Sequence, residues 1–177
     1  MNFILEKSLE ILVKTPLILE SYLSDLSDEW IHDNEGEDTW SPYDIVGHLI
    51  HGEKTDWLVR VKIIIDQQGD RTFDPFDRIA QFKESRSKSL VQLTEEFKLL
   101  RNDNLTELRA LNITEEMLDR EGIHPDFGKV TLKQLFATWV VHDLGHIAQI
   151  SRVMAYQYRK DVGPWKAYLR IIENDES

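Results

Sequence analysis

The stretch Trp139-Val-Val-His142-Asp143-Leu-Gly-His146-Ile-Ala-Gln-Ile150 lies inside one long helical pattern near the C-terminus. His142 and His146 are four residues apart, so on a helix their rings project from the same face, one turn after the other. This spacing suits two imidazoles that bind one metal ion. The alternative is a pair of core histidines satisfied by hydrogen bonds, with Asp143 as their partner. The pair alone leaves both interpretations open, and a third ligand would decide between them.

The same helix carries a continuous apolar stripe on one face. The stripe consists of Leu132, Phe136, Trp139, Val140, Ile147, Ile150 and Met154. His146 falls within the stripe, Asp143 lies near its middle, and His142 lies at its edge. Ionisable side chains are costly to bury unless they are paired or bind something. The pattern therefore indicates a polar site on the buried face of this helix.

The composition is that of a soluble globular protein. Of the 177 residues, 41% are hydrophobic and 30% are charged, and we expect a single domain over residues 1–177. A net charge of −11 argues against nucleic-acid binding, which needs a basic surface. No segment approaches the roughly 18 apolar residues of a membrane span, and the first residues, Met1-Asn-Phe-Ile-Leu-Glu6, lack the basic start of a signal peptide. We therefore expect a cytoplasmic protein that binds neither nucleic acid nor membrane.

The chain contains no cysteine. This excludes disulfides, thiolate ligands and a cysteine nucleophile. Any metal must be held by imidazole, carboxylate or water. If the protein performs thiol chemistry, the thiol belongs to the substrate.

Four long segments have apolar residues at helical spacing, and we expect them to form the body of the fold. They cover residues 3–26, 41–68, 87–111 and 131–158. Ser41-Pro42-Tyr43-Asp44 and Thr131-Leu-Lys-Gln134 have the capping residues of helix starts. No pattern of alternating strands is visible. The predicted fold is all-α, an antiparallel four-helix bundle with short extra helices near 78–84 and 165–172.

Four further histidines, His32, His48, His51 and His124, are candidates for the third ligand. His32 borders an acidic loop and is read most simply as a surface residue, and His124 precedes a proline in a loop. His48 and His51 share the second long helix. The helical pattern does not choose cleanly between them, but His48 lies closer to the buried face and is the favoured candidate.

The residues around His48 carry a resemblance to a known family. Thr39-Trp-Ser-Pro-Tyr-Asp-Ile-Val-Gly-His48-Leu, together with the His142-to-Ile150 stretch, resembles the DinB-like superfamily of metalloenzymes. Gly128-Lys-Val-Thr-Leu-Lys-Gln-Leu-Phe-Ala-Thr-Trp-Val-Val-His142 and Val162-Gly-Pro-Trp165 resemble one branch of it. The resemblance covers essentially the whole chain. It implies a four-helix bundle, usually a homodimer, with a divalent metal held by three histidines.

Carried over residue by residue, the implied metal ligands are His48, His142 and His146, and His51 has no ligand role. Characterised relatives include S-transferases that use low-molecular-weight thiols such as bacillithiol or mycothiol. Many members have no assigned reaction. The resemblance therefore implies a small-molecule substrate, and with it the use of a low-molecular-weight thiol, without naming the reaction.

Three imidazoles with open positions are typical of a catalytic metal site. Zinc and nickel are the first candidates, and iron, manganese and copper also suit imidazole ligands. The metal could present a thiolate for S-transfer onto a small electrophile, or it could activate water for hydrolysis. A non-catalytic reading is also open, in which the metal staples a stress-related dimeric bundle. No catalytic residue is assigned.

Several other side chains are candidates for supporting roles in this site. Asp143, Glu53 and Asp56 could orient a ligand ring or transfer a proton. Each of them is more simply read as an ordinary polar side chain. Four tryptophans could line an apolar pocket beside the metal, namely Trp40, Trp57, Trp139 and Trp165.

Overall fold

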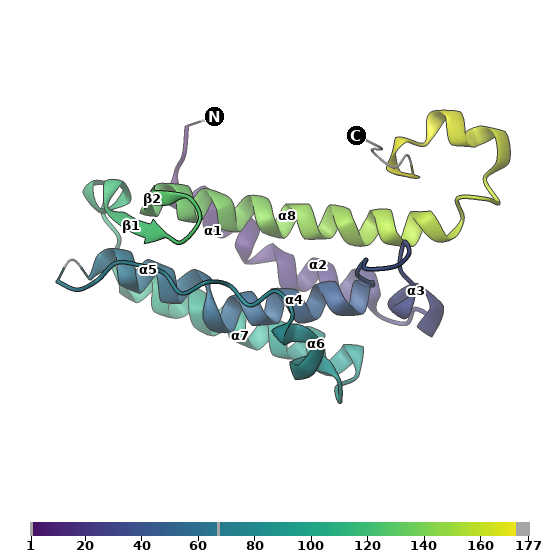
Figure 1. Cartoon of the computed structure of the whole chain (residues 1–177), viewed down its shortest axis with the longest axis horizontal. Helices are drawn as coiled ribbons and strands as arrows, with labels where there is room; N and C mark the ends of the chain where they lie inside the picture. Colours follow the sequence, from purple (N-terminus) through teal and green to yellow (C-terminus); the bar gives the residue numbers. More distant parts are fainter. Residues whose placement is uncertain (1, 67, 173–177) are drawn as a thin grey trace.

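Four long helical segments make up the body of the computed structural model, which describes residues 2–66 and 68–172 (Figure 1). They are α1 (Leu5–Leu12) with α2 (Lys14–Leu23), α4 (Pro42–Thr55) with α5 (Trp57–Ile65), α7 (Leu90–Ala110) and α8 (Leu132–Gln157). The connections contain α3 (Asp28–His32), α6 (Ala80–Ser85) and the 3-10 turns η1 (Glu115–Asp119), η2 (Gly163–Tyr168) and η3 (Arg170–Ile172). The predicted four-helix bundle with short extra helices is confirmed.

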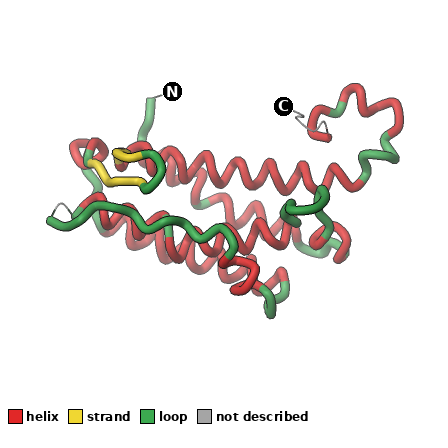
Figure 2. The backbone as a smooth tube through the Cα atoms, viewed as in Figure 1, coloured by secondary structure: helices red, strands yellow, loops and turns green. Residues whose placement is uncertain are grey.

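The order of the helices around the bundle does not follow the chain. Helix α4 packs against α7 and α8, while α1 and α2 also pack against α8 and α7. The connection over residues 68–79 runs back along the length of the bundle (Figures 1 and 2). As a result α7 runs in the same direction as α4 and α5, and α1, α2 and α8 run in the opposite direction. The bundle is therefore antiparallel between these two pairs.

The predicted capping residues begin α4 and α8, the two helices that carry His48, His142 and His146. The Ser41 hydroxyl accepts a hydrogen bond from the Asp44 backbone N–H at 3.2 Å, and the Asp44 carboxylate accepts one from the Ser41 backbone N–H at 3.0 Å. Thr131 and Gln134 make the equivalent pair at the start of α8. These reciprocal bonds satisfy backbone N–H groups that a helix start otherwise leaves unpaired.

Two of the expected helices are interrupted. The first breaks at Val13, and the second breaks at Asp56, whose backbone angles are φ −117° and ψ −79°. The Thr15-Pro16 pair predicts a bend or restart of the first helix, and the break at Val13 lies close to it. An uninterrupted second helix over 41–68 was wrong. The Asp56 break directs the residues that follow it, beginning with Trp57, toward α8.

A short β-hairpin also departs from the expected all-helical chain. Strand β1 (Glu121–His124) pairs antiparallel with β2 (Gly128–Thr131), from Glu121 opposite Thr131 to His124 opposite Gly128. Gly128 has a φ of +70°, a conformation that glycine adopts without the steric penalty of a side chain. The sequence shows no sign of these strands because four residues are too few to show an alternating pattern. The fold class remains all-α.

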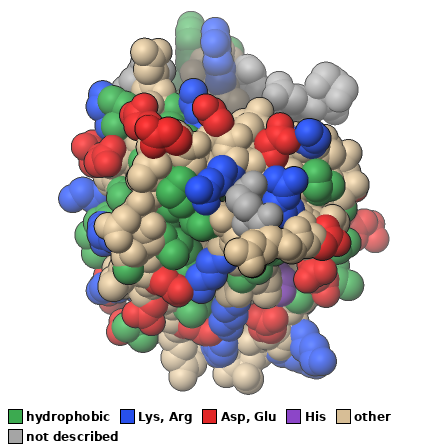
Figure 3. All heavy atoms as spheres, turned by 90° about the vertical axis from the view of Figure 1, so that its left-hand side faces the viewer, with side chains coloured by type: hydrophobic (Ala, Val, Ile, Leu, Met, Phe, Trp, Pro, Cys, Tyr) green, Lys and Arg blue, Asp and Glu red, His purple; other side chains and the backbone are tan. Residues whose placement is uncertain are grey.

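The hairpin is attached to the connection that precedes α6. The Phe73 backbone N–H donates to the Ile123 carbonyl at 2.9 Å, and the Ile123 N–H donates to the Arg71 carbonyl at 2.8 Å. Gly122 permits this close approach, since a Cβ atom there would lie 2.6 Å from the Phe73 ring. Figure 3 views this end of the molecule, where acidic and basic side chains are interspersed with apolar ones.

The buried interior is divided into two apolar halves with a polar layer between them. One half contains Leu12, Trp57, Leu105 and Trp139, and the other contains Leu19, Ile50, Phe97 and Ile150. Between these levels lie buried charged side chains, those of Glu53, Arg101 and Asp143. Within the described residues, no helix is both long enough and apolar enough to cross a membrane.

Candidate metal centre

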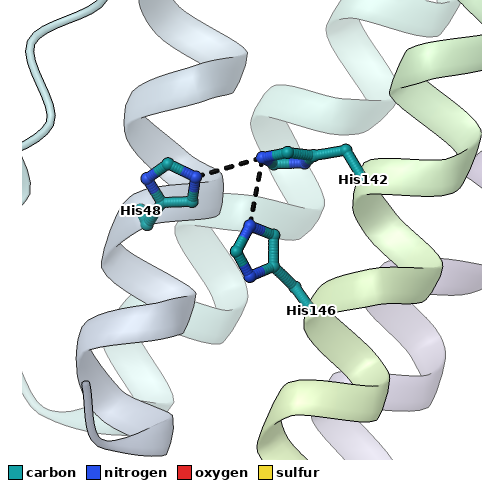
Figure 4. A group of neighbouring side chains, drawn as sticks. All are labelled: His48, His142 and His146. Atoms are coloured by element: carbon teal, nitrogen blue, oxygen red, sulfur yellow. Dashed lines mark hydrogen bonds between the residues drawn. The ribbon is translucent and has the colours of Figure 1, made fainter. Parts of the chain in front are cut away.

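Three histidines from two helices converge beside the polar layer. His48 lies on α4, and His142 and His146 lie one turn apart on α8 (Figure 4). The Nε2 atom of His142 is 3.0 Å from Nε2 of His48 and 3.1 Å from Nε2 of His146. One ring nitrogen of each residue lies within 4.8 Å of the others. The histidine from the second long helix and the two from the last one thus meet at one point.

The orientation of His146 is set by a neighbour on its own helix. Its Nδ1 atom lies 2.8 Å from Oε1 of Gln149. An amide oxygen only accepts hydrogen bonds, so Nδ1 carries the proton in the neutral ring. The lone pair then resides on Nε2, which faces the other two histidines. An outer hydrogen bond of this kind is typical of a metal-binding histidine.

His48 is held by packing from α6 and from Trp40. The Trp40 ring lies 4.8 Å from the His48 ring, centroid to centroid. Gly47 lets α6 approach, because a Cβ atom there would lie 2.5 Å from the Ser85 hydroxyl. This approach brings the buried Gln81 close to His48. Among the described residues, the Nδ1 atom of His48 is buried without a hydrogen-bond partner at normal distance.

His142 is enclosed by Trp57 and Asp143. The Trp57 ring meets the His142 ring edge-on at 5.0 Å. The Asp143 carboxylate lies 4.0 Å from Nδ1 of His142, which is too long for a hydrogen bond but close enough for its charge to act on the ring. Although burial alone would raise the pKa of Asp143, the polar contacts of His142 and Arg101 hold it below its ordinary value.

Burial keeps two of the three rings neutral. Burial, together with the neighbouring His146 and His142, lowers the pKa of His48 to about 3. Burial and the proximity of His142 lower the pKa of His146 to about 4. A charged imidazolium is costly in such a place, whereas a neutral imidazole is the form that ligates metals.

This donor set fits a divalent ion. Tetrahedral coordination at about 2.0–2.1 Å would place the nitrogens of neighbouring ligands about 3.3 Å apart. The observed separations of 3.0 and 3.1 Å are close to that value. Three neutral imidazoles facing one point also leave lone pairs that they cannot all satisfy among themselves.

The other histidines lie outside this cluster. His51 is as buried as His48, at 5% and 8% exposure, but its ring faces Phe76 and its Nδ1 lies 3.3 Å from Glu84 of α6. The helical pattern suggested that His48 would be the more buried of the two, but burial does not distinguish them. They differ in direction, because the His48 ring faces His142 and His146 whereas His51 faces Phe76 and Glu84. His32 is exposed and lies against Tyr43.

A cavity of about 540 Å³ opens beside the three histidines. Helices α4 and α5 line it with every fourth residue, namely His48, Gly52, Asp56 and Arg60. Helix α8 does the same with Gln134, Thr138, His142 and His146. The connection before α6 also lines the cavity, through Phe73 and Phe76, as does the hairpin tip, through His124 and Phe127. The volume is in the range of sites for small molecules.

The candidate supporting residues separate into two groups. Asp56 lines the cavity and pairs with Arg60. Burial raises the pKa of Asp56, and the charges of Arg60, His142 and His124 oppose this rise. Glu53 and Asp143 instead bind Arg101 in the bundle interior.

Arg101, which sequence reasoning missed, occupies a core position of α7. It lies four residues after Phe97 and four before Leu105, both of which are buried. A charged residue in the middle of an apolar stripe was the signal that could have identified it.

Two of the four candidate tryptophans line the cavity, Trp40 and Trp57. The other two do not, and the core or an interface is the more usual place for a single tryptophan. Trp139 is fully buried and stacks on Trp57 at 5.6 Å, and Trp165 lies on η2 with 70% of its surface exposed.

Comparison with known proteins identifies the family. A family model described as the DinB superfamily matches residues 11–150. No curated protein matches the chain. Among solved structures, the chain is similar to YfiT from Bacillus subtilis, which is described as a probable metal-dependent hydrolase with an unusual four-helix bundle topology. That match has 20% sequence identity and a TM-score of 0.72, and it covers 90% of this chain and 87% of the other. This chain belongs to the DinB superfamily.

Proposed function

We propose that the protein is a metal-dependent hydrolase of a small-molecule substrate, with one divalent ion bound by His48, His142 and His146. The observation that carries the proposal is the convergence of three imidazole Nε2 atoms at the wall of a cavity. Structural zinc sites are closed by four protein ligands, whereas catalytic sites keep a position open. Three ligands beside a cavity match the second arrangement.

The ion would supply a nucleophile by lowering the pKa of a bound water toward about 7. Imidazole ligands suit zinc and nickel, and they also suit iron, copper and manganese to differing degrees. The identity of the ion is therefore left to measurement. Hydrolysis is preferred over S-transfer because YfiT, which has a similar fold, is described as a probable hydrolase.

Asp56 is the carboxylate of this chain that is placed to move a proton in the cavity. It is 7% exposed and lies at the break between α4 and α5, two helical turns from His48. Its raised pKa makes it a better proton acceptor than an ordinary aspartate. Arg60 pairs with its carboxylate and holds its direction.

The aromatic walls of the cavity would hold the body of the substrate. Trp40 and Trp57 flank the histidines, Phe76 contacts His48, and Phe73 and Phe127 also line the cavity. Such walls exclude water and favour a substrate with an apolar part. The amide, ester or related group would then lie between the histidines and Asp56.

A screen of the metal-loaded protein tests this function. Purified protein loaded with zinc or nickel is incubated with chromogenic esters, anilides and phosphoesters, with and without added thiols. We expect turnover of at least one substrate without a thiol, and its loss in His142→Ala but not in His51→Ala. Turnover that requires a thiol would replace hydrolysis with S-transfer. Metal binding without turnover across the panel would favour a non-catalytic metal site.

A further inference from the structure

The polar layer between the two apolar halves is organised by a single arginine. The guanidinium of Arg101 donates to both carboxylate oxygens of Asp143, at 2.6 and 3.1 Å, and to Glu53 at 2.8 Å. It also donates to the backbone carbonyl of Leu12 at 2.8 Å. The side chains of Arg101, Glu53 and Asp143 are all completely buried. One side chain of α7 thus binds α8, α4 and α1.

The partners of Arg101 lie next to the proposed metal ligands on both ligand-bearing helices. Asp143 directly follows His142 on α8, and Glu53 lies five residues after His48 on α4. Asn104 fixes Glu53 further, since its amide donates to the Glu53 carboxylate at 2.9 Å and to the Glu53 carbonyl at 2.8 Å. Helices α4 and α8 are therefore both hydrogen-bonded to the Arg101 guanidinium, close to the level of the histidine cluster.

Stability alone does not account for this buried network. Removing several charges from water costs about as much as their attraction returns, and apolar side chains of similar volume often stabilise a core equally well. Apolar contacts are not directional, so they allow neighbouring helices small shifts along and around their axes. The planar fork of arginine can donate hydrogen bonds to two carboxylates in only a few geometries. We therefore expect the network to fix the relative positions of the helices rather than to raise the net free energy of unfolding.

A metal site with three protein ligands requires that its ligand atoms are held in fixed relative positions. Its donor atoms must be held within about 0.5 Å of their proper places, and here they come from two helices that have no covalent link nearby. The Arg101 guanidinium lies over the rings of Phe97 and Trp139, with its Cζ atom 5.0 and 5.1 Å from their centroids. These contacts fix the guanidinium between the two apolar halves.

We propose that Arg101 is a positioning residue of the metal centre, which holds α4 against α8 so that the three Nε2 atoms converge. The inference rests on the proposed metal site. It adds that metal affinity depends on a side chain that does not contact the metal.

Two substitutions separate the charge of Arg101 from its geometry. Arg101→Lys keeps the charge but cannot bind Asp143 and Glu53 with a planar fork. Arg101→Met keeps the approximate length and removes the charge. Leu105→Ala serves as the control, because it removes a buried side chain one turn further along α7 without touching the network.

The experiment compares zinc affinity by competition titration, the visible spectrum of the cobalt-loaded protein, and the urea midpoint for each variant. We expect Arg101→Lys and Arg101→Met to bind zinc about 10- to 100-fold more weakly and to show an altered cobalt spectrum. Leu105→Ala should lose stability and keep its zinc affinity within about twofold. If Arg101→Met does not fold, Arg101→Lys carries the test.

Zinc affinity within about twofold of the parent in Arg101→Lys would overturn the proposal, as would an equal loss in Leu105→Ala. If the unaltered protein binds no divalent ion, the proposed metal site fails first, and the positioning role fails with it. Normal metal binding by the parent and by the Arg101 variants would overturn the positioning role alone.

Discussion

The Nε2 atoms of His48 and His142 lie 3.0 Å apart, although 94 positions separate the two residues in the sequence. This short distance requires that α4 and α8 lie side by side and that His48 and His142 lie at the same level along the bundle. That level coincides with the polar layer in which Arg101 binds Glu53 and Asp143. The proposed chemistry of the bundle is thus concentrated where its apolar core is interrupted.

Acidification should destabilise the metal-free protein through His48 and His146. Their pKa values in the folded chain, about 3 and about 4, lie below the ordinary value of 6.5. At intermediate pH the unfolded chain binds protons that the folded chain does not, so the free energy of unfolding falls as the pH falls from about 6.5 toward 4. Urea denaturation of metal-free protein at about pH 7 and about pH 5 measures this dependence.

The variant His48→Gln should show a smaller difference between the two pH values, because it lacks one of the two groups. His32→Gln is the control, since His32 is exposed and its loss should leave the difference unchanged. Equal pH dependence in the parent and in His48→Gln would show that the cluster is not buried as described.

Asp56→Asn should lower hydrolysis of any substrate found in the screen by about 100-fold, the scale of general acid–base catalysis. The pKa of Asp56 is raised, so the parent's activity should rise with pH through a value above the ordinary aspartate value of 3.8. Metal content should be unchanged, because Asp56 is not a proposed ligand. The measurement is the pH profile of kcat/KM together with the bound metal.

Asp126→Asn is the matched control for Asp56→Asn. Asp126 is an exposed carboxylate on the hairpin tip that lines the same cavity. Its loss should change kcat/KM by no more than about twofold, as is usual for a surface charge. A comparable loss of activity in both variants would argue for a general charge effect and against a proton-transfer role of Asp56.

Gly122→Ala should destabilise the protein by about 1–3 kcal/mol, as overpacking does in a filled core. Its Cβ atom would lie 2.6 Å from the Phe73 ring and 2.9 Å from Ile64. Gly145→Ala on α8 has no atom within 4 Å of its new Cβ and should be neutral or stabilise by about 0.5–1 kcal/mol. Thermal unfolding of both variants checks the packing of the hairpin wall, and a neutral Gly122→Ala would contradict it.

We expect the chain to form a homodimer. Val141 and Leu144 on α8 are 67% and 46% exposed, and α2 presents Leu17 and Ile18 at 45% and 42%. Exposed apolar side chains of this kind are typical of an interface between copies. Sedimentation at micromolar concentration should give a dimer for the parent and for Val91→Glu, and a monomer for Val141→Glu with Leu144→Glu. A monomeric parent would contradict the expectation.

The helices and the histidine cluster could be predicted because their signals are local. Ser41 and Thr131 begin helices through residues within three positions of them, and the four-residue spacing of His142 and His146 is a property of any helix. The choice of His48 over His51 came from the family resemblance more than from burial, since both side chains are buried.

The remaining features depend on contacts between distant segments. The break at Asp56 places that carboxylate in the cavity, yet the sequence there continues a helical pattern with no proline, and its nearest glycine, Gly52, lies four residues earlier inside α4. The hairpin of β1 and β2 is bonded through Ile123 to Phe73 and Arg71, in a connection about fifty residues earlier in the chain. Arg101 stands in the apolar stripe of α7, but its partners on α4 and α8 could not be read from that stripe.

The most direct test of the central claim is metal stoichiometry in single-histidine variants. Protein is stripped, reloaded with zinc and dialysed, and bound metal is measured by mass spectrometry. The account predicts one ion per chain in the parent and in His51→Ala, and loss of that ion in His48→Ala, His142→Ala and His146→Ala. Retention of the ion in any of those three variants, or its loss in His51→Ala, would contradict the proposed ligand set.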